Sequence, residues 1–203
     1  MNQTRTLGTP RLLGIVWPFI AVVLFQALLG GVSLYVLSAV RGYVAGESLW
    51  SKGQKDAIYY LNLYADGRDE SKFLKYQEAI AVPQGGHELR VALDQQPPDL
   101  EAARQAILKG GNHPDDVPSL IWLYLNFRHF SFLEKAIDLW TVGDGYLVQL
   151  DDVARDMHQH ISVRQTTPAD IQRWKEQIFA INDEVTPAAK AFSDALGEGS
   201  RIA

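Results

Sequence analysis

The chain has 203 residues, of which 47% are hydrophobic and 21% are charged, with a formal net charge of −5 and no cysteine. The lack of cysteine excludes disulfide scaffolds, iron–sulfur clusters, cysteine-based zinc sites and thiol catalysis. The acidic balance argues against a general nucleic-acid-binding protein, which carries a basic patch, so we expect no nucleic-acid partner.

An uncharged apolar segment lies near the N-terminus, from Leu12 to Val40, between Arg11 and Arg41. A helix of about 20 apolar residues spans a bilayer, and this segment exceeds that length. It is too long for the apolar core of a signal peptide, and a soluble core helix is rarely apolar on every face. The segment therefore predicts one uncleaved transmembrane helix over residues 12–40, with the lipid bilayer as its partner.

The charges on either side of this helix predict its orientation. Arg5 and Arg11 precede it without any acidic residue, whereas acidic residues accompany the bases that follow it. Because Lys and Arg favour the cytoplasmic side, we expect residues 1–11 in the cytoplasm. We expect the chain in a bacterial inner membrane, with the residues from about 42 onward in the periplasm.

Residues 41–203 form the expected extracytoplasmic domain. Its apolar residues recur every three to four positions, which predicts an all-helical region. Proline, glycine and capping residues mark where the helices begin and end. The predicted elements are a continuation of the first helix to Asp66-Gly67, a helix over Glu70–Ala81 ended by Pro83 and Gly85-Gly86, a short helical piece over 87–95, a helix from Pro97-Pro98-Asp99 to Lys109, a helix over Val117–Phe130, a long helix capped by Ser131 and reaching about His160, and a last helix capped by Thr167.

The last helix carries the most regular apolar stripe in the chain. The stripe consists of Ile171, Trp174, Ile178, Ile181, Val185, Ala188, Phe192 and Ala195. This alternating spacing of three and four is typical of a bundle or coiled-coil seam, so it predicts packing within its own bundle or against a second copy in a homodimer. Pro187 should kink the helix or restart it. The predicted fold is all-α, with one transmembrane helix followed by an up-and-down helical bundle that contains a short helical insertion.

Four parts of the sequence carry a resemblance to a known class of proteins: Leu12–Val40, WSKGQKDAIYYLNLYA (Trp50 to Ala65), GGNHPDDVP (Gly110 to Pro118) and INDEVTPAAKAFSDALGE (Ile181 to Glu198). Their arrangement resembles the N-terminal sensor region of bacterial signalling receptors, which include sensor histidine kinases and GGDEF or EAL cyclic di-GMP proteins. The resemblance implies a signal-input module for an unknown small-molecule or protein stimulus. It also implies a cytoplasmic output domain beyond Ala203, so we expect a chain cut before a second transmembrane helix.

The loop GGNHPDDVP is the most concentrated polar motif. Its Asn112, His113, Asp115 and Asp116 are candidate ligand-binding residues for a small molecule or a cation. The alternative is a turn between helices, because proline and aspartate are both favoured at the start of a helix. The sequence leaves both interpretations open.

An aromatic segment, IWLYLNFRHF (Ile121 to Phe130), follows this loop. Trp122 and Arg128 are candidate ligand-binding residues, because an arginine pairs with an organic anion while aromatic rings supply apolar area. The neighbouring Tyr124, Phe127 and His129 would complete such a pocket. The alternative is a helix buried in the bundle core, with Arg128 at its edge.

No motif predicts a metal site, a cofactor or a catalytic residue. His158 and His160 lie two apart and therefore face different sides of a helix, and a zinc site needs three or four ligands. The sequence contains no P-loop, G-x-S-x-G, H-E-x-x-H or G-x-G-x-x-G motif. A membrane-anchored scaffold or accessory subunit of an envelope complex is the alternative function. A membrane-anchored enzyme is a third possibility, which a buried cluster that includes His113, Asp116 and Arg128 would favour.

Overall fold

The computed structural model describes residues 9–202. All the secondary-structure elements among these residues are helices, which confirms the all-α prediction. The elements in chain order are α1 (Thr9–Gly67), α2 (Glu70–Asp94), α3 (Leu100–Lys109), the short 3₁₀ helix η1 (Pro114–Asp116), α4 (Val117–Phe127), α5 (Ser131–Ser162) and α6 (Pro168–Ile202). The chain divides into two compact units between Ser38 and Ala39. Residues 1–8 of the predicted cytoplasmic N-terminus lie outside the described residues.

The described part of the first unit is an apolar helix. Its large side chains face outward: Trp17, Phe19 and Leu34 are 65–70% exposed. In the described part of the chain, α1 is the one helix long and apolar enough to cross a membrane, with a mean hydropathy of 2.2 over its most apolar window and none of that window buried. Exposed apolar side chains in such numbers distinguish this segment from the core helix of a soluble protein.

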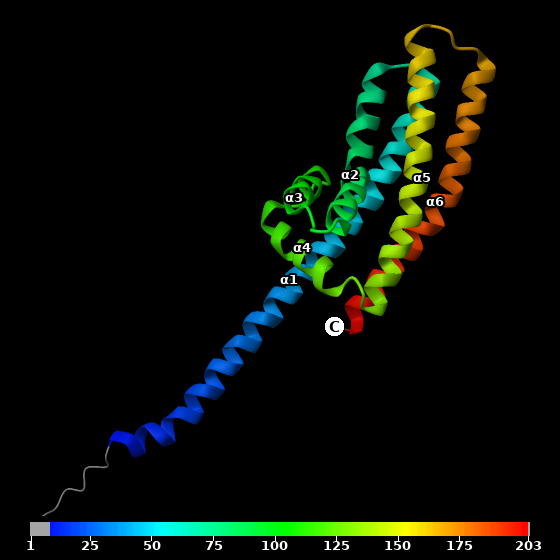
Figure 1. Cartoon of the computed structure of the whole chain (residues 1–203). Helices are drawn as coiled ribbons and strands as arrows, with labels where there is room; N and C mark the ends of the chain where they lie inside the picture. Colours follow the sequence, from blue (N-terminus) through cyan, green and yellow to red (C-terminus); the bar gives the residue numbers. More distant parts are fainter. Residues whose placement is uncertain (1–8, 203) are drawn as a thin grey trace, which may run out of the picture. The chain divides into compact units, whose positions relative to one another are not determined.

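The second unit is a bundle of four long helices, formed by α1 from Ala39 onward, α2, α5 and α6 (Figure 1). Their inward faces share one core, because the apolar residues of each helix recur at helical spacing. The core includes Trp50, Leu61 and Tyr64 of α1, Phe73, Tyr76 and Ile80 of α2, Leu133, Leu150 and Met157 of α5, and Trp174, Ile178 and Val185 of α6. The helices α3 and α4 form the predicted insertion between α2 and α5, beside α2 (Figure 1).

The stripe on α6 packs within its own bundle. Trp174, Ile178, Val185 and Phe192 are all buried against α1 and α5 in a single chain. Helix α6 runs through Pro187 without a break, so the predicted restart at this proline is wrong. Proline has no N–H to donate to the Asp183 carbonyl one turn earlier. Because Pro187 and Asp183 are both exposed, water can bond that carbonyl instead. The predicted stripe is wrong at Ala188, which is half-buried, because Ala189 takes the buried position just after the proline.

The predicted end of α2 near Ala81 is wrong, because the helix continues through Pro83, Gly85 and Gly86 to Asp94. The two glycines serve close packing. A Cβ at Gly85 would lie 2.6 Å from the Ala106 backbone oxygen of α3, and a Cβ at Gly86 would lie 2.7 Å from the Trp140 ring of α5. Pro83 leaves the Ala79 carbonyl without its intrahelical donor. That oxygen would lie 2.9 Å from a Cβ at Gly53, so α1 also approaches α2 through a glycine.

Two smaller predictions at helix ends need correction. Helix α5 begins at Ser131, and Phe130 takes the N-cap position predicted for Ser131. Helix α4 ends at Phe127 and not at Phe130: the Arg128 N–H makes the last bond of the helix, to the Tyr124 carbonyl, and the Phe130 N–H then bonds the Phe127 carbonyl in a turn. By contrast, α3 begins directly after the Pro97-Pro98-Asp99 segment predicted to open it, and Asp99 caps it by accepting a 2.9 Å bond from the Ala102 N–H.

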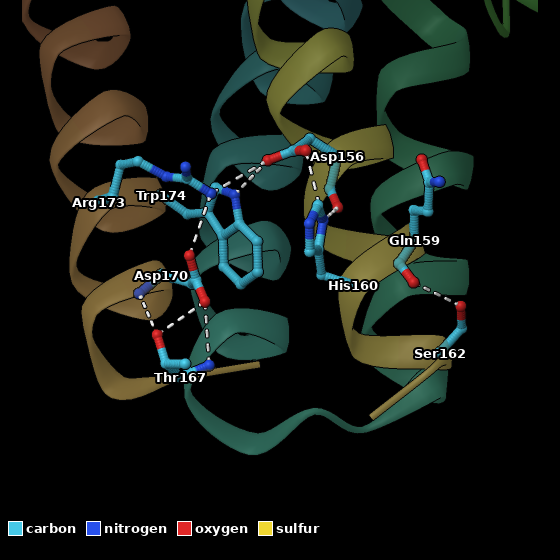
Figure 2. Close-up of polar contacts among 8 residues, drawn as sticks. All are labelled: Asp156, Gln159, His160, Ser162, Thr167, Asp170, Arg173 and Trp174. Atoms are coloured by element: carbon cyan, nitrogen blue, oxygen red, sulfur yellow. Dashed lines mark hydrogen bonds and ion pairs between the residues drawn. The ribbon is translucent and has the colours of Figure 1, made fainter. Parts of the chain in front are cut away.

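The turn between α5 and α6 is held by a polar network around Trp174 (Figure 2). The indole Nε1–H of this buried ring donates to Asp156 Oδ2 at 2.6 Å. At the start of α6, the Thr167 hydroxyl and N–H donate to Asp170 Oδ2 at 2.7 and 3.0 Å, and the Asp170 N–H donates back to the Thr167 hydroxyl at 3.2 Å. This reciprocal capping box confirms Thr167 as the predicted cap.

Replacing Gly85 by alanine should destabilise the bundle by about 1–3 kcal/mol, because the new methyl group meets backbone atoms of α3 that cannot move independently. The control is Gly145→Ala, in α5, where a Cβ meets nothing within 4 Å. This change should raise the free energy of unfolding by about 0.5–1 kcal/mol through helix propensity. Urea denaturation of both variants measures the difference, and equal effects would contradict the packing role of Gly85.

The capping box predicts a pH dependence. Hydrogen bonds from Thr167 lower the pKa of Asp170 below its ordinary value of 3.8. A lowered folded-state pKa stabilises the protein above that ordinary value, and the stabilisation is lost as the pH falls through the folded-state pKa. Thr167→Ala should therefore reduce the free energy of unfolding at pH 7, and the difference from the unmodified chain should narrow below about pH 4. A difference that is constant from pH 7 to pH 2 would contradict this assignment.

Candidate functional site

A cavity of about 60 Å³ lies inside the second unit, where α1, α2, α3, α5 and α6 meet. Glycines form much of its wall: Gly42, Gly46, Gly85, Gly86 and Gly110. Their missing side chains let the helix backbones approach and leave room between the larger residues. The remaining wall is aromatic and aliphatic.

Four aromatic side chains line this cavity, namely Tyr43 and Trp50 of α1, Trp140 of α5 and Phe192 of α6. The Phe192 ring lies 6.0 Å from the ring centres of both tryptophans, edge-on to Trp50 and nearly stacked on Trp140. These separations are typical of favourable aromatic pairs. The rings therefore connect the first and last helices of the bundle directly at the cavity.

Three hydrogen-bond donors on the cavity-lining residues have no acceptor among the described residues. They are the Tyr43 hydroxyl and the indole Nε1–H groups of Trp50 and Trp140, all buried. Buried polar groups in proteins nearly always have a partner, and an unpaired one costs about 1–3 kcal/mol. The charged group on the described cavity wall is the Glu47 carboxylate, which accepts a 2.9 Å bond from the Ser51 hydroxyl.

The four candidate residues of the loop GGNHPDDVP divide into two half-buried residues, Asn112 and Asp116, and two exposed ones, His113 and Asp115. Asn112 lines the cavity, and its Nδ2 donates to the Ile107 carbonyl at 3.2 Å. Asp116 forms a 3.4 Å ion pair with Arg41 of α1. His113 and Asp115 are exposed, and the His113 ring caps η1 by accepting from the Asp115 N–H at 3.2 Å. The capping role matches the turn interpretation, while Asn112 belongs to the cavity.

The predicted residues on α4 lie elsewhere. Arg128 pairs with Asp94 at the end of α2 at 2.7 Å, and Tyr124 donates to the same carboxylate at 3.0 Å. Trp122 is half-buried and packs on Phe127 at 5.2 Å. Neither Trp122 nor Arg128 lines the cavity, and Arg128 already has a carboxylate partner. His113, Asp116 and Arg128 thus each have a different partner.

A second, more polar cavity of about 210 Å³ lies between α2 and α5. Its wall includes Asp144, which is only 5% exposed and bonds both Arg90 and the His87 Nδ1, the latter at 3.0 Å. One carboxylate oxygen of Asp144 and the Arg90 Nε have no partner among the described residues. Sequence reasoning missed this cluster, although Asp144 stands four residues after Trp140 and three before Leu147 on the apolar stripe of α5.

The described residues contain no group of three or more metal-ligating side chains. His160 pairs with Asp156 on its own helix at 3.4 Å, beside Trp174 in the polar network of the α5–α6 turn (Figure 2). His158 stacks on Phe73 at 3.9 Å and pairs with Glu70 at 3.0 Å. Both histidines thus take part in packing contacts.

Comparisons with protein-family models, with curated proteins and with solved structures gave no match.

Replacing Arg90 by methionine should lower the free energy of unfolding by about 3–5 kcal/mol, because it leaves the Asp144 carboxylate buried without its main partner. Adding Asp144→Asn to this variant should restore part of the loss. The control is Lys109→Met, which breaks the exposed Lys109–Glu88 pair and should change stability by less than about 1 kcal/mol. Chemical denaturation provides the measurement, and similar losses in the two single variants would show that Asp144 tolerates isolation.

Proposed function

We propose that this chain is the signal-input module of a bacterial inner-membrane receptor. In this proposal residues 12–40 span the membrane and the bundle lies in the periplasm. A stimulus there changes the relation between the bundle's first and last helices, and a cytoplasmic output domain outside this sequence reads the change. The output would be a histidine kinase or an enzyme of cyclic di-GMP turnover, as the sequence resemblance implies.

One observation carries the proposal: the cavity is lined by both terminal helices of the bundle. Tyr43 and Trp50 come from α1, and Phe192 comes from α6. The Trp50 and Phe192 rings, whose centres lie 6.0 Å apart, both belong to the cavity wall. A ligand that enters must touch both helices, so its binding energy depends on how they are positioned.

Such a dependence is what a sensor requires. A ligand shifts a conformational equilibrium only by the difference between its affinities for the two states. Helix shifts of 1–2 Å are a known means of transmitting such differences. Helix α1 carries both the apolar segment and, from Ala39, part of the cavity wall, so motion of its cavity end can be passed along one continuous helix.

The test begins with a thermal-shift screen of the full chain in lipid nanodiscs. The probes are amino acids, organic acids, polyamines, divalent metals and small neutral ketones, alcohols and amides. A probe that binds only the folded state should add about 2.7 kcal/mol at 100 times its dissociation constant. The gain should disappear when Phe192 is replaced by alanine.

Distance measurements then test the coupling. Because the chain has no cysteine, Val44→Cys with Asp194→Cys introduces a unique spin-label pair on α1 and α6, at exposed positions. A binding probe should shift the distance distribution of this pair. The control pair, Gln159→Cys with Gln177→Cys, lies on exposed positions of α5 and α6 and should stay unchanged. Binding that leaves the α1–α6 distance unchanged would contradict a sensor role and favour a scaffold. A screen without hits would contradict the sensing of a small molecule in this cavity and favour a partner protein or membrane state as the stimulus, or the scaffold.

A further inference from the structure

Helix α4 is apolar on both of its faces. Its 11 residues, VPSLIWLYLNF, include none that is charged. The face toward the bundle carries four buried side chains: Val117, Leu120, Leu123 and Tyr124. On the opposite face Pro118 is exposed, and Trp122 and Leu125 are half-buried. The outer face of a surface helix is normally polar, as it is in the neighbouring α3 at Glu101 and Arg104, so the outer face of α4 requires another surrounding than water.

Aromatic side chains extend this apolar surface past the end of α4. The rings of Trp122 and Phe127 lie 5.2 Å apart, and the rings of Phe127 and Phe130 lie 5.1 Å apart. Phe130 is 54% exposed. Tryptophan, phenylalanine and leucine are the residues typical of the apolar face of a helix that lies at a bilayer surface. The other face of such a helix is polar when it meets water, whereas in α4 it packs on the bundle.

The N-terminal end of α4 lies where the chain leaves the proposed membrane span. Asp116, just before the helix, pairs with Arg41 of α1 at 3.4 Å. The Leu120 side chain would lie 3.2 Å from a Cβ at Gly42. Gly42 follows Val40, the last residue of the proposed span, by two positions, which is a rise of about 3 Å along a helix. This end of α4 is therefore at the height of the expected bilayer boundary.

The C-terminal end of α4 lies at the same height along the bundle. Helices α1 and α2 run antiparallel, and a Cβ at Gly53 of α1 would lie 3.0 Å from the ring of Pro83 in α2. Eleven residues from this contact, backward along α1 and forward along α2, Gly42 corresponds in height to Asp94. Tyr124, in the last turn of α4, donates to that aspartate at 3.0 Å. Helix α4 therefore runs across the bundle at the height of Gly42.

We propose that the outer face of α4, formed by Pro118, Trp122 and Leu125, lies together with Phe130 in the interfacial region of the lipid bilayer. The inference rests on the proposed function, from which it takes the span over residues 12–40. A helix at this height has lipid headgroups beside it whenever that segment spans the membrane, so no further partner is required to cover its apolar face. The tryptophan ring, which is apolar and carries one N–H group, suits the boundary between lipid and water.

This contact connects the membrane surface to the cavity. Leu120 on the inner face of α4 lines the cavity, and so does Gly42, on which it packs. In the proposal, lipid that moves α4 also moves one wall of the cavity. The state of the membrane is then a stimulus that reaches the same helices as a ligand in the cavity.

Spin labels measure the lipid contact in the full chain, reconstituted in phosphatidylcholine nanodiscs. Because the chain has no cysteine, Pro118→Cys and Asn126→Cys each place a single label at an exposed position, one near each end of α4. Power saturation compares the access of oxygen, which concentrates in lipid, with that of a water-soluble nickel chelate. Both labels should prefer oxygen several-fold more than a control label on α3, placed by Gln105→Cys at an exposed position. Leu24→Cys, 61% exposed within the proposed span, is the lipid reference.

A matched pair of substitutions tests whether the aromatic surface holds α4 at the bilayer. Phe130→Glu and Phe179→Glu each place a carboxylate where a phenylalanine is exposed, by 54% and 66%. Phe179 lies on α6 near the pair of Lys175 and Asp66, at the end of α1 remote from the proposed span. Only Phe130→Glu should lower the oxygen preference of the Asn126→Cys label, toward the value of the α3 control. The thermal midpoints of both variants should be similar, because neither side chain is buried.

The outcomes separate the lipid contact from the sensor function. If the α4 labels match the α3 control while the Leu24→Cys label prefers oxygen, the span stands and the lipid contact of α4 is refuted. Labels on α4 that are shielded from both oxygen and the chelate would also refute it, because a second copy or another protein then covers the helix. If the α4 labels prefer oxygen but a bound probe leaves the α1–α6 distance unchanged, the lipid contact is confirmed and the sensor function is refuted. A Leu24→Cys label that prefers the chelate would refute the span and both proposals.

Discussion

The close approach of helix backbones at Gly85 and Gly86 is the constraint on which the rest of the bundle depends. At these two residues α2 meets the α3 backbone on one side and the Trp140 ring of α5 on the other, at distances that exclude any side chain. This contact fixes the insertion against the bundle, and the insertion places Asn112 and Leu120 against Gly46 and Gly42 of α1. The cavity is the space that remains between the glycine-lined helices and the aromatic rings, because the rings are too large to pack into it completely.

The sequence predicts the helices well where local chemistry decides them. The alternating spacing of three and four in the last helix predicts the buried face of α6. Asp99 and Thr167 mark where α3 and α6 begin, because a capping residue satisfies free N–H groups of the first turn only a few residues away. It fails at Pro83 and Gly85-Gly86, where tertiary contacts outweigh local propensity. A glycine that ends a helix and a glycine that admits a neighbouring backbone look alike in a sequence, and only the partner helix distinguishes them.

The site is harder to predict than the fold for a related reason. Trp50 and Trp140 lie on apolar stripes, and periodicity correctly places them inside, while Tyr43 is half-buried. Whether an inward-facing indole finds an acceptor depends on residues far away in the chain: Trp174 meets Asp156, whereas Trp50 and Trp140 meet glycines and a phenylalanine. The exposed polar loop attracts attention in the sequence, yet of its four candidate residues only Asn112 lines the cavity.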